Sequence, residues 1–170
     1  HGVGVSCVNA LSKWLKLTIR RDGKAHYMEF ARGVIQNRNI QEENGVATSP
    51  ITVTGDTELS GTEVHFLADE EIFGNIEFHY EILVKRIREL SFLNKRISIS
   101  LTDLRELDEN GAPYVNKFYS EGGIIEFVEL LDKQANRNAI IAQPLYVEGL
   151  DEATNVAVEV ALTYNDDFKE

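Results

Sequence analysis

The chain has 170 residues, of which 43% are hydrophobic and 26% are charged, and it carries a formal net charge of −11. This composition is typical of a globular chain in water, with room for one domain or for one domain and part of a second. No apolar run approaches the roughly 20 residues that a membrane-spanning helix needs. A single cysteine, Cys7, cannot form an internal disulfide. We therefore expect a cytoplasmic protein with no membrane contact.

The charge is unevenly distributed along the chain. Residues 1–34 carry a net charge of +4, whereas residues 35–170 carry −15. A nucleic-acid-binding surface needs a positive footprint, and most of this chain has the opposite. Only the basic N-terminal segment could face an anion, and the solvated face of a helix and a hairpin is the simpler explanation for most of its charges.

Hydrophobic periodicity predicts an alternation of helices and strands. The expected helices are residues 5–14, 78–92 and 124–131. The expected strands are residues 15–21, 25–30, 51–54, 62–67, 97–102 and 156–162, with a short extension at 33–35. Asp22-Gly23 and residues 108–111 are typical of hairpin turns, and residues 36–49 of an irregular excursion. Strands joined by hairpins, with helices between them, predict an α+β layered fold.

The chain opens with a glycine-spaced turn, His1-Gly2-Val3-Gly4, which leads directly into the first expected helix. Glycines let the backbone approach a ligand, and a helix N-terminus presents free N–H groups. The pattern favours an anion such as a phosphate. A tight turn that binds nothing is the common explanation for Gly-x-Gly alone. Helical spacing places Cys7 on the buried side, so we interpret its thiol as a small hydrophobic group rather than a nucleophile.

Other candidate sites are weaker. His26, His65 and His79 have no second ligand at metal spacing, so they do not indicate a metal site. The acidic runs at residues 69–71 and 166–167 are interpreted as solvated turns.

Five segments together resemble the B subunits of bacterial type IIA topoisomerases, in the same order. They are residues 1–12, 60–66, 86–94, 118–124 and 158–166. The resemblance extends over essentially the whole chain and is weakest at residues 36–50 and 134–155. It implies the C-terminal half of a GHKL (Bergerat-type) ATPase domain, a two-layer α/β sandwich, followed by the start of an α/β transducer domain. The expected domains are residues 1–117 and residues 118–170.

The resemblance also implies an ATP site. The residues that match nucleotide-binding positions of the family are His1, Gly2, Val3, Gly4, Val5 and Thr62, and those at its pocket rim or inhibitor contacts are Arg21 and Val64. The first four match the end of a lid over the triphosphate, and Val5 lines the adenine pocket. The Thr62 hydroxyl joins the adenine hydrogen-bond network, although β propensity alone also explains a threonine on a strand.

Three residues that the family's chemistry needs cannot be placed in this sequence. They are the glutamate general base, an asparagine on the same helix that holds Mg²⁺, and an aspartate that reads the adenine amino group. The resemblance puts them upstream of the lid, and it puts the terminal-phosphate lysine and glutamine beyond Glu170. We therefore expect an internal fragment with no catalytic residue and no metal ligand of its own. It should not turn over ATP alone, because attack by water needs a positioned base and a metal.

The implied activity belongs to the intact enzyme, in which ATP binding dimerises a gate and hydrolysis resets it to pass one DNA duplex through another. The implied partners are the A subunit, which carries the cleavage tyrosine, a second copy of the B subunit, and double-stranded DNA held by other parts of the enzyme. Residues 86–94 are closer to the supercoiling gyrase branch of the family. The decatenating topoisomerase IV branch stays an alternative, and so does a non-enzymatic interaction domain with a structural glycine turn.

Overall fold

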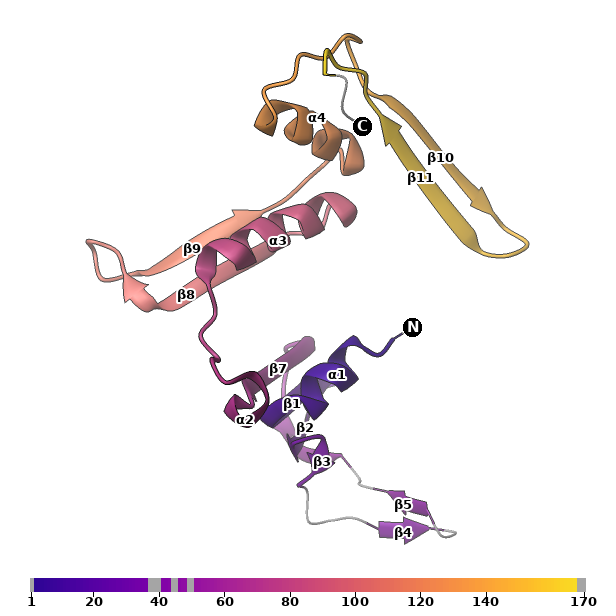
Figure 1. Cartoon of the computed structure of the whole chain (residues 1–170). Coiled ribbons are helices and arrows are strands. Elements are labelled where there is room, and N and C mark those ends of the chain that lie inside the picture. Colours follow the sequence, from indigo (N-terminus) through magenta and orange to yellow (C-terminus); the bar gives the residue numbers. More distant parts are fainter. Residues whose placement is uncertain (1, 37–40, 44–45, 49–50, 168–170) are drawn as a thin grey trace. The chain divides into compact units, whose positions relative to one another are not determined.

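The computed structural model describes residues 2–36, 41–43, 46–48 and 51–167. The chain divides into two compact units, residues 1–77 and residues 78–170 (Figure 1). The predicted boundary after residue 117 lies within the second unit, following its first hairpin, and it remains a prediction. No helix in the described part of the chain combines the length and the apolarity needed to cross a bilayer.

Unit 1 is built on an antiparallel five-stranded sheet in which the strand order is β3-β2-β1-β7 and β6 pairs with β2. Its strands are β1 (Ser12–Arg21), β2 (Lys24–Ala31), β3 (Val34–Ile35), β6 (Thr52–Asp56) and β7 (Gly61–Ala68). The short helices α1 (Gly4–Ala10) and α2 (Glu70–Phe73) precede and follow it, and β4 (Gln41–Glu43) pairs separately with β5 (Val46–Thr48). The predicted hairpin at Asp22-Gly23 is confirmed, with φ values of 52° and 75° that suit a tight two-residue turn.

The first helix ends earlier than its apolar spacing predicts. It stops at Ala10, and β1 already begins at Ser12, which pairs with Ala68 of β7. The buried Ser12 hydroxyl donates to the Val8 carbonyl at 2.6 Å and so closes the end of the helix. Cross-strand pairing therefore takes residues 12–14 from the helix. No residue of α1 is buried and Cys7 is exposed, so the interpretation of its thiol as a core group is wrong.

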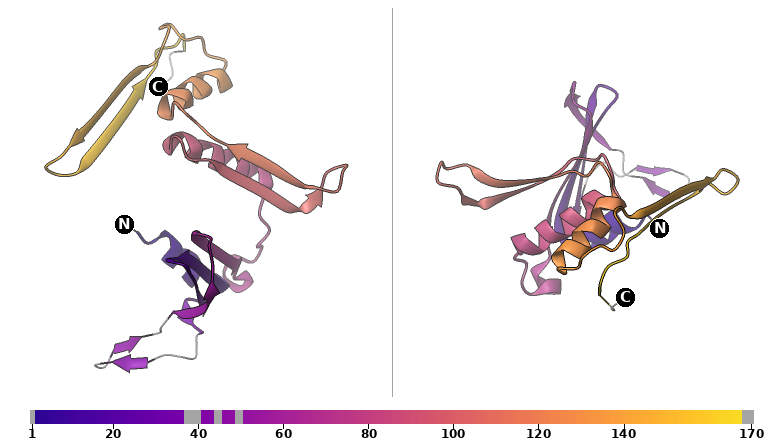
Figure 2. Two further views of the ribbon diagram at one scale, coloured as in Figure 1. Left: turned by 180° about the vertical axis from the view of Figure 1, so that it is seen from behind. Right: turned by 90° about the horizontal axis from the view of Figure 1, so that it is seen from above.

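Unit 2 combines two hairpins with two helices. Its elements are α3 (Tyr80–Leu93), β8 (Ile99–Leu107), β9 (Pro113–Phe118), α4 (Ile124–Gln134), β10 (Leu145–Asp151) and β11 (Val156–Leu162). Helix α3 packs on both β8 and β9 and on α4, as the two views of Figure 2 also show. Stacked rings of Phe92 and Phe127, 5.4 Å apart, join the two helices.

The buried side of α3 differs from the expected one. Phe78, Ile82 and Leu90, which we expected on the inner side, are exposed, whereas Val84 and Ser91 are buried. Val84 and Ser91 are seven residues apart and therefore share a helix face. The strands β9 and β10 carry no expected element, because their alternation is interrupted by polar residues and by Gly149.

Candidate functional site

The N-terminal end of α1 is shaped to accept an anion. Gly2 has φ +67°, and an added Cβ at Gly2 or Gly4 would meet no atom within 4 Å. Val3 is the N-cap of α1, and no side chain caps the first-turn N–H groups. These groups have no acceptor inside the helix, so they are available to an oxygen-rich ligand. His1 lies outside the described residues.

The predicted adenine-side residues lie on one face of the sheet. Thr62 is directly opposite Ile19 in the β1–β7 ladder, and Val64 is opposite Leu17. Alternate residues of a strand point to the same side, so Thr62, Val64 and the strand-end Arg21 share the face that also carries Leu15. Leu15 is only 2% exposed, whereas Val64 is 40% exposed. This face therefore has a packed inner part and an open part where Thr62 and Val64 lie.

The structure brings Arg21, Thr62 and Val64 together, but it keeps them apart from Gly2–Val5 along the strand. Thr62 pairs near the hairpin end of β1, whereas α1 joins β1 at the opposite end, at Ser12. Val5 is 61% exposed, so in this structure its side chain does not line a closed pocket. The two groups are separate halves of the predicted site, and their joint role in nucleotide binding stays a prediction.

Most cations of the basic N-terminal segment are already paired with carboxylates. Arg20 contacts Glu63 at 2.9 Å, and Lys24 contacts Asp56 at 2.5 Å. Lys13 contacts Glu70 at 2.9 Å. Arg21 makes a longer contact of 3.5 Å with Asp22 and keeps a largely exposed side chain. Because exposed pairs of this kind contribute little, they balance the local charge without creating a broad anion-attracting surface.

Asp69 and Arg32 form an ionic contact at the end of β7 that the sequence patterns missed. The Asp69 side chain is 1% exposed, accepts from the Glu71 N–H at 3.0 Å and lies 2.6 Å from Arg32 Nε. The Glu71 amide, followed by the Arg32 guanidinium, holds the pKa of the Asp69 carboxyl below its usual range. Asp69 is therefore the N-cap of α2 rather than part of a solvated acidic turn. The signal that could have found it is the aspartate followed by two glutamates, typical of a helix start.

The described residues contain no group of three or more His, Cys, Asp or Glu side chains able to hold a metal ion. The isolated histidine His65 instead packs edge-to-face on Trp14, with ring centroids 4.9 Å apart. The structure thus gives the candidate site backbone donors, a hydroxyl and an open apolar surface, which suit the phosphates and base of a nucleotide.

Comparison with known proteins finds relatives along the whole chain. It is 49% identical over 170 residues to the DNA gyrase B subunit of Chitinophaga japonensis, 44% to that of Cytophaga aurantiaca, and 40% over 169 residues to that of Halalkalibacterium halodurans. These alignments cover 99–100% of this chain but 33%, 32% and 23% of the three relatives. The chain thus spans a third or less of their length. No protein-family model matches it.

A solved structure gives the same result for the fold. The 43K ATPase domain of Thermus thermophilus gyrase B, crystallised with an aminocoumarin, superimposes with a TM-score of 0.73 at 28% identity. The match covers 96% of this chain and 39% of that one. It confirms the predicted mixed α/β fold of the GHKL type, with its antiparallel sheets.

Proposed function

Since this chain is homologous along its whole length to the B subunit of DNA gyrase, we propose that it forms part of the ATP-binding region of a type IIA DNA topoisomerase. The observation that carries the proposal is the α1 N-terminus, whose glycines leave open space and whose first-turn N–H groups have no side-chain cap. In the intact enzyme, nucleotide binding here is proposed to close and dimerise a gate, and hydrolysis to reopen it.

The phosphates of ATP are proposed to approach the backbone of Gly2, Val3 and Gly4, with His1 completing the end of the lid. A helix N-terminus favours a phosphate through its N–H groups and its dipole, which contributes about 0.3–1 kcal/mol at an exposed site. The side chain of Val5 would then turn from solvent toward the base. Ordering of this segment on the ligand is a closure step of the kind that shields phosphoryl chemistry from water.

The adenine is proposed to lie on the open part of the β1–β7 face. Val64 supplies apolar contact, and the Thr62 hydroxyl supplies a hydrogen bond that orients the base. Arg21 lies on the same face at the end of β1 and is proposed to border the pocket. Its exposed guanidinium can reach a ligand because its ionic contact with Asp22 is 3.5 Å long and equally exposed to solvent.

Magnesium is proposed to be held by residues outside the described ones, since these offer no metal-binding group. ATP supplies the phosphoryl group when bound, and the residues described here bind and orient it. The general base for hydrolysis is likewise proposed to come from elsewhere in the enzyme. We expect these 170 residues alone not to turn over ATP.

The proposed partners are the A subunit of gyrase, a second copy of the B subunit, and double-stranded DNA bound by other parts of the enzyme in the cytoplasm. The proposed outcome is negative supercoiling, in keeping with relatives that are all named gyrase. A topoisomerase IV activity would instead decatenate without supercoiling. A plasmid relaxation and supercoiling assay of the full-length protein, reconstituted with its partner protein, separates the two.

Substitution of Gly4 by alanine tests the phosphate role. The added methyl meets no atom of the protein within 4 Å, and the position is helical, so folding should be unaffected or slightly favoured. We expect the affinity of the full-length protein for a non-hydrolysable ATP analogue to fall about tenfold, equivalent to about 1.4 kcal/mol, because the methyl lies where the phosphates approach. Titration calorimetry measures this.

Gly55→Ala is the matched control, because Gly55 in β6 also has open space around it. Its affinity should equal that of the unmodified protein. Equal affinities for Gly4→Ala and Gly55→Ala would contradict the proposed phosphate site.

A further inference from the structure

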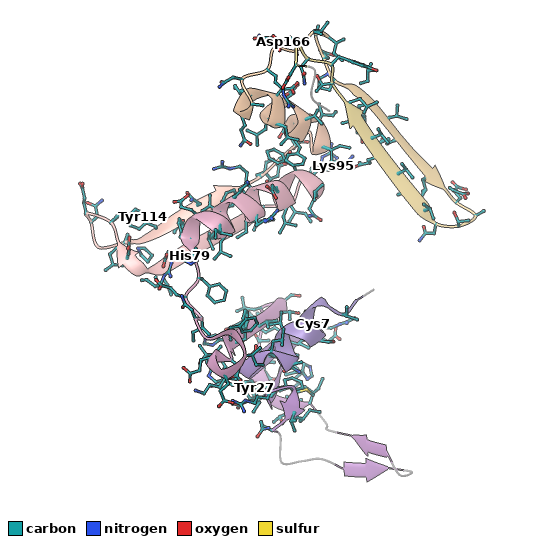
Figure 3. All side chains as sticks on the ribbon, in the orientation of Figure 1. Cys7, Tyr27, His79, Lys95, Tyr114 and Asp166 are labelled. Atoms are coloured by element: carbon teal, nitrogen blue, oxygen red, sulfur yellow. The ribbon has the colours of Figure 1, made fainter. Side chains whose placement is uncertain are left out.

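Lys95 occupies the junction between α3 and the second hairpin of unit 2. It follows Asn94, the C-cap of α3, and Figure 3 labels it at this end of the helix. Its Nζ lies 2.5 Å from Glu159 Oε1, 3.4 Å from Glu148 Oε2 and 3.3 Å from the Tyr146 hydroxyl. The ammonium also lies 5.7 Å from the centre of the Tyr146 ring. One cation from the helix side thus contacts three side chains of the β10–β11 hairpin.

The hairpin needs a cation at this place. Glu148 and Glu159 are directly paired across β10 and β11, and like charges in that position destabilise a ladder. The Tyr146 hydroxyl lies 2.6 Å from Glu148 Oε2 and 3.0 Å from Glu159 Oε1. With Lys95 the cluster has two carboxylates, one ammonium and one hydroxyl, so most of the repulsion is relieved. The Lys95 ammonium also lowers the pKa of the Glu159 carboxyl from its ordinary value.

The aliphatic part of Lys95 is held on its other side by the start of α4. A Cβ added to Gly123 would lie 3.1 Å from Lys95 Cβ and 3.3 Å from the Phe92 carbonyl oxygen. The next residue, Arg96, donates its N–H to the Ser120 carbonyl at 2.8 Å. The stem of Lys95 therefore lies between α3 and α4, while its charged end reaches the hairpin. Helix α4 also packs directly against β11.

We propose that Lys95 is a clamp that holds the β10–β11 hairpin against the junction of α3 and α4, so that these three elements move as one body. A two-stranded hairpin is at best marginally stable in water and depends on what it packs against. Both of its strands carry outward-facing valines that are more than 40% exposed, so the hairpin has few apolar contacts to fix its direction. The clamp supplies a directional contact in their place, and it operates whether or not nucleotide is bound.

The proposal predicts which variants free the hairpin. Lys95→Met keeps the packed stem against Gly123 and removes the ammonium. We expect amide hydrogen exchange of residues 145–162 in the full-length protein to rise, up to about fivefold, the factor that corresponds to an exposed ion pair at the upper end of its usual range. Lys95→Arg, which retains the charge, should restore slow exchange. Mass spectrometry of peptides from the hairpin measures both.

Arg96→Met is the matched control, because Arg96 pairs with Glu121 rather than with the hairpin. It should leave exchange of the hairpin unchanged. Glu159→Gln removes the charge from the other side and should act like Lys95→Met, which keeps the proposal testable if one variant folds poorly. Hairpin exchange in both variants that matches the Arg96→Met control would overturn the clamp.

Discussion

Thr62 distinguishes binding from folding at the scale of a single residue. Its side chain is exposed on β7, so Thr62→Ala should change the free energy of unfolding by no more than about 0.5 kcal/mol. If its hydroxyl orients adenine, the same change removes a hydrogen bond and weakens binding of an ATP analogue about fivefold, or about 1 kcal/mol. Calorimetric titration and urea unfolding of one preparation give both numbers.

Thr102→Ala, at an exposed site on β8, is the control for Thr62→Ala. Loss of stability without loss of affinity in Thr62→Ala would show that this threonine is present for its strand propensity alone.

Gly123 makes a second prediction at this scale, because its conformation excludes other residues. It is buried with φ 63° and ψ −128° at the N-cap of α4, and an added Cβ would approach Lys95 and Phe92. Gly123→Ala should lower the free energy of unfolding by about 1–3 kcal/mol. Gly149→Ala has open space and no positive φ, so it should be near neutral. Urea unfolding that gives equal values for the two variants would contradict this account of the turn.

Single residues were predictable where a backbone rule constrains them. The turn at Asp22-Gly23 follows from left-handed conformations that few residues tolerate. Asp69 and Lys95 were not, because their partners Arg32 and Glu159 lie 37 and 64 residues away in the sequence. Periodicity carries no information on such pairs. The exposure of Cys7 was missed for a similar reason, since the burial of a helix face depends on what covers it.

At the scale of elements, strand pairing overrides helical spacing where the two compete. Apolar residues at positions 5, 8, 11 and 15 predict a helix into residue 14, but β7 provides a partner ladder from Ser12 onward. In α3 the same competition decides the buried face, because contacts with β8, β9 and α4 select Val84 and Ser91. The existence of these elements could be predicted from the sequence. Their ends and buried sides depend on tertiary partners.

The β8–β9 hairpin gives a pH-dependent prediction. Hydrogen bonds from Arg105, its guanidinium first and its backbone N–H second, lower the pKa of the Asp103 carboxyl from 3.8 to about 2. A pKa that is lower in the folded chain stabilises it above the unfolded pKa, and this contribution is lost as the pH falls from about 4 to about 2.

Asp103→Asn should therefore be less stable than the unmodified protein at pH 6, and the difference should shrink toward pH 2. Urea unfolding across this range measures it. A difference that is constant with pH would show that the ionised carboxylate does not contribute.

For the whole molecule, the charge distribution and the divided site have one explanation. A net charge of −11 is unsuited to holding DNA, and the cations near the candidate site are mostly paired. Both observations agree with a nucleotide-binding role in which DNA is bound by other parts of a larger enzyme. The resemblance to the topoisomerase B subunits supplied this role, because no single motif in the chain specifies a reaction.

The central claim is that nucleotide binding at this region closes a gate between two copies of the protein. The most direct measurement is the molar mass of the full-length protein by light scattering, with and without a non-hydrolysable ATP analogue and Mg²⁺, together with its melting temperature. The account predicts a shift from monomer to dimer and a higher melting temperature when the analogue is present. A mass and a melting temperature that do not respond to the analogue would contradict it.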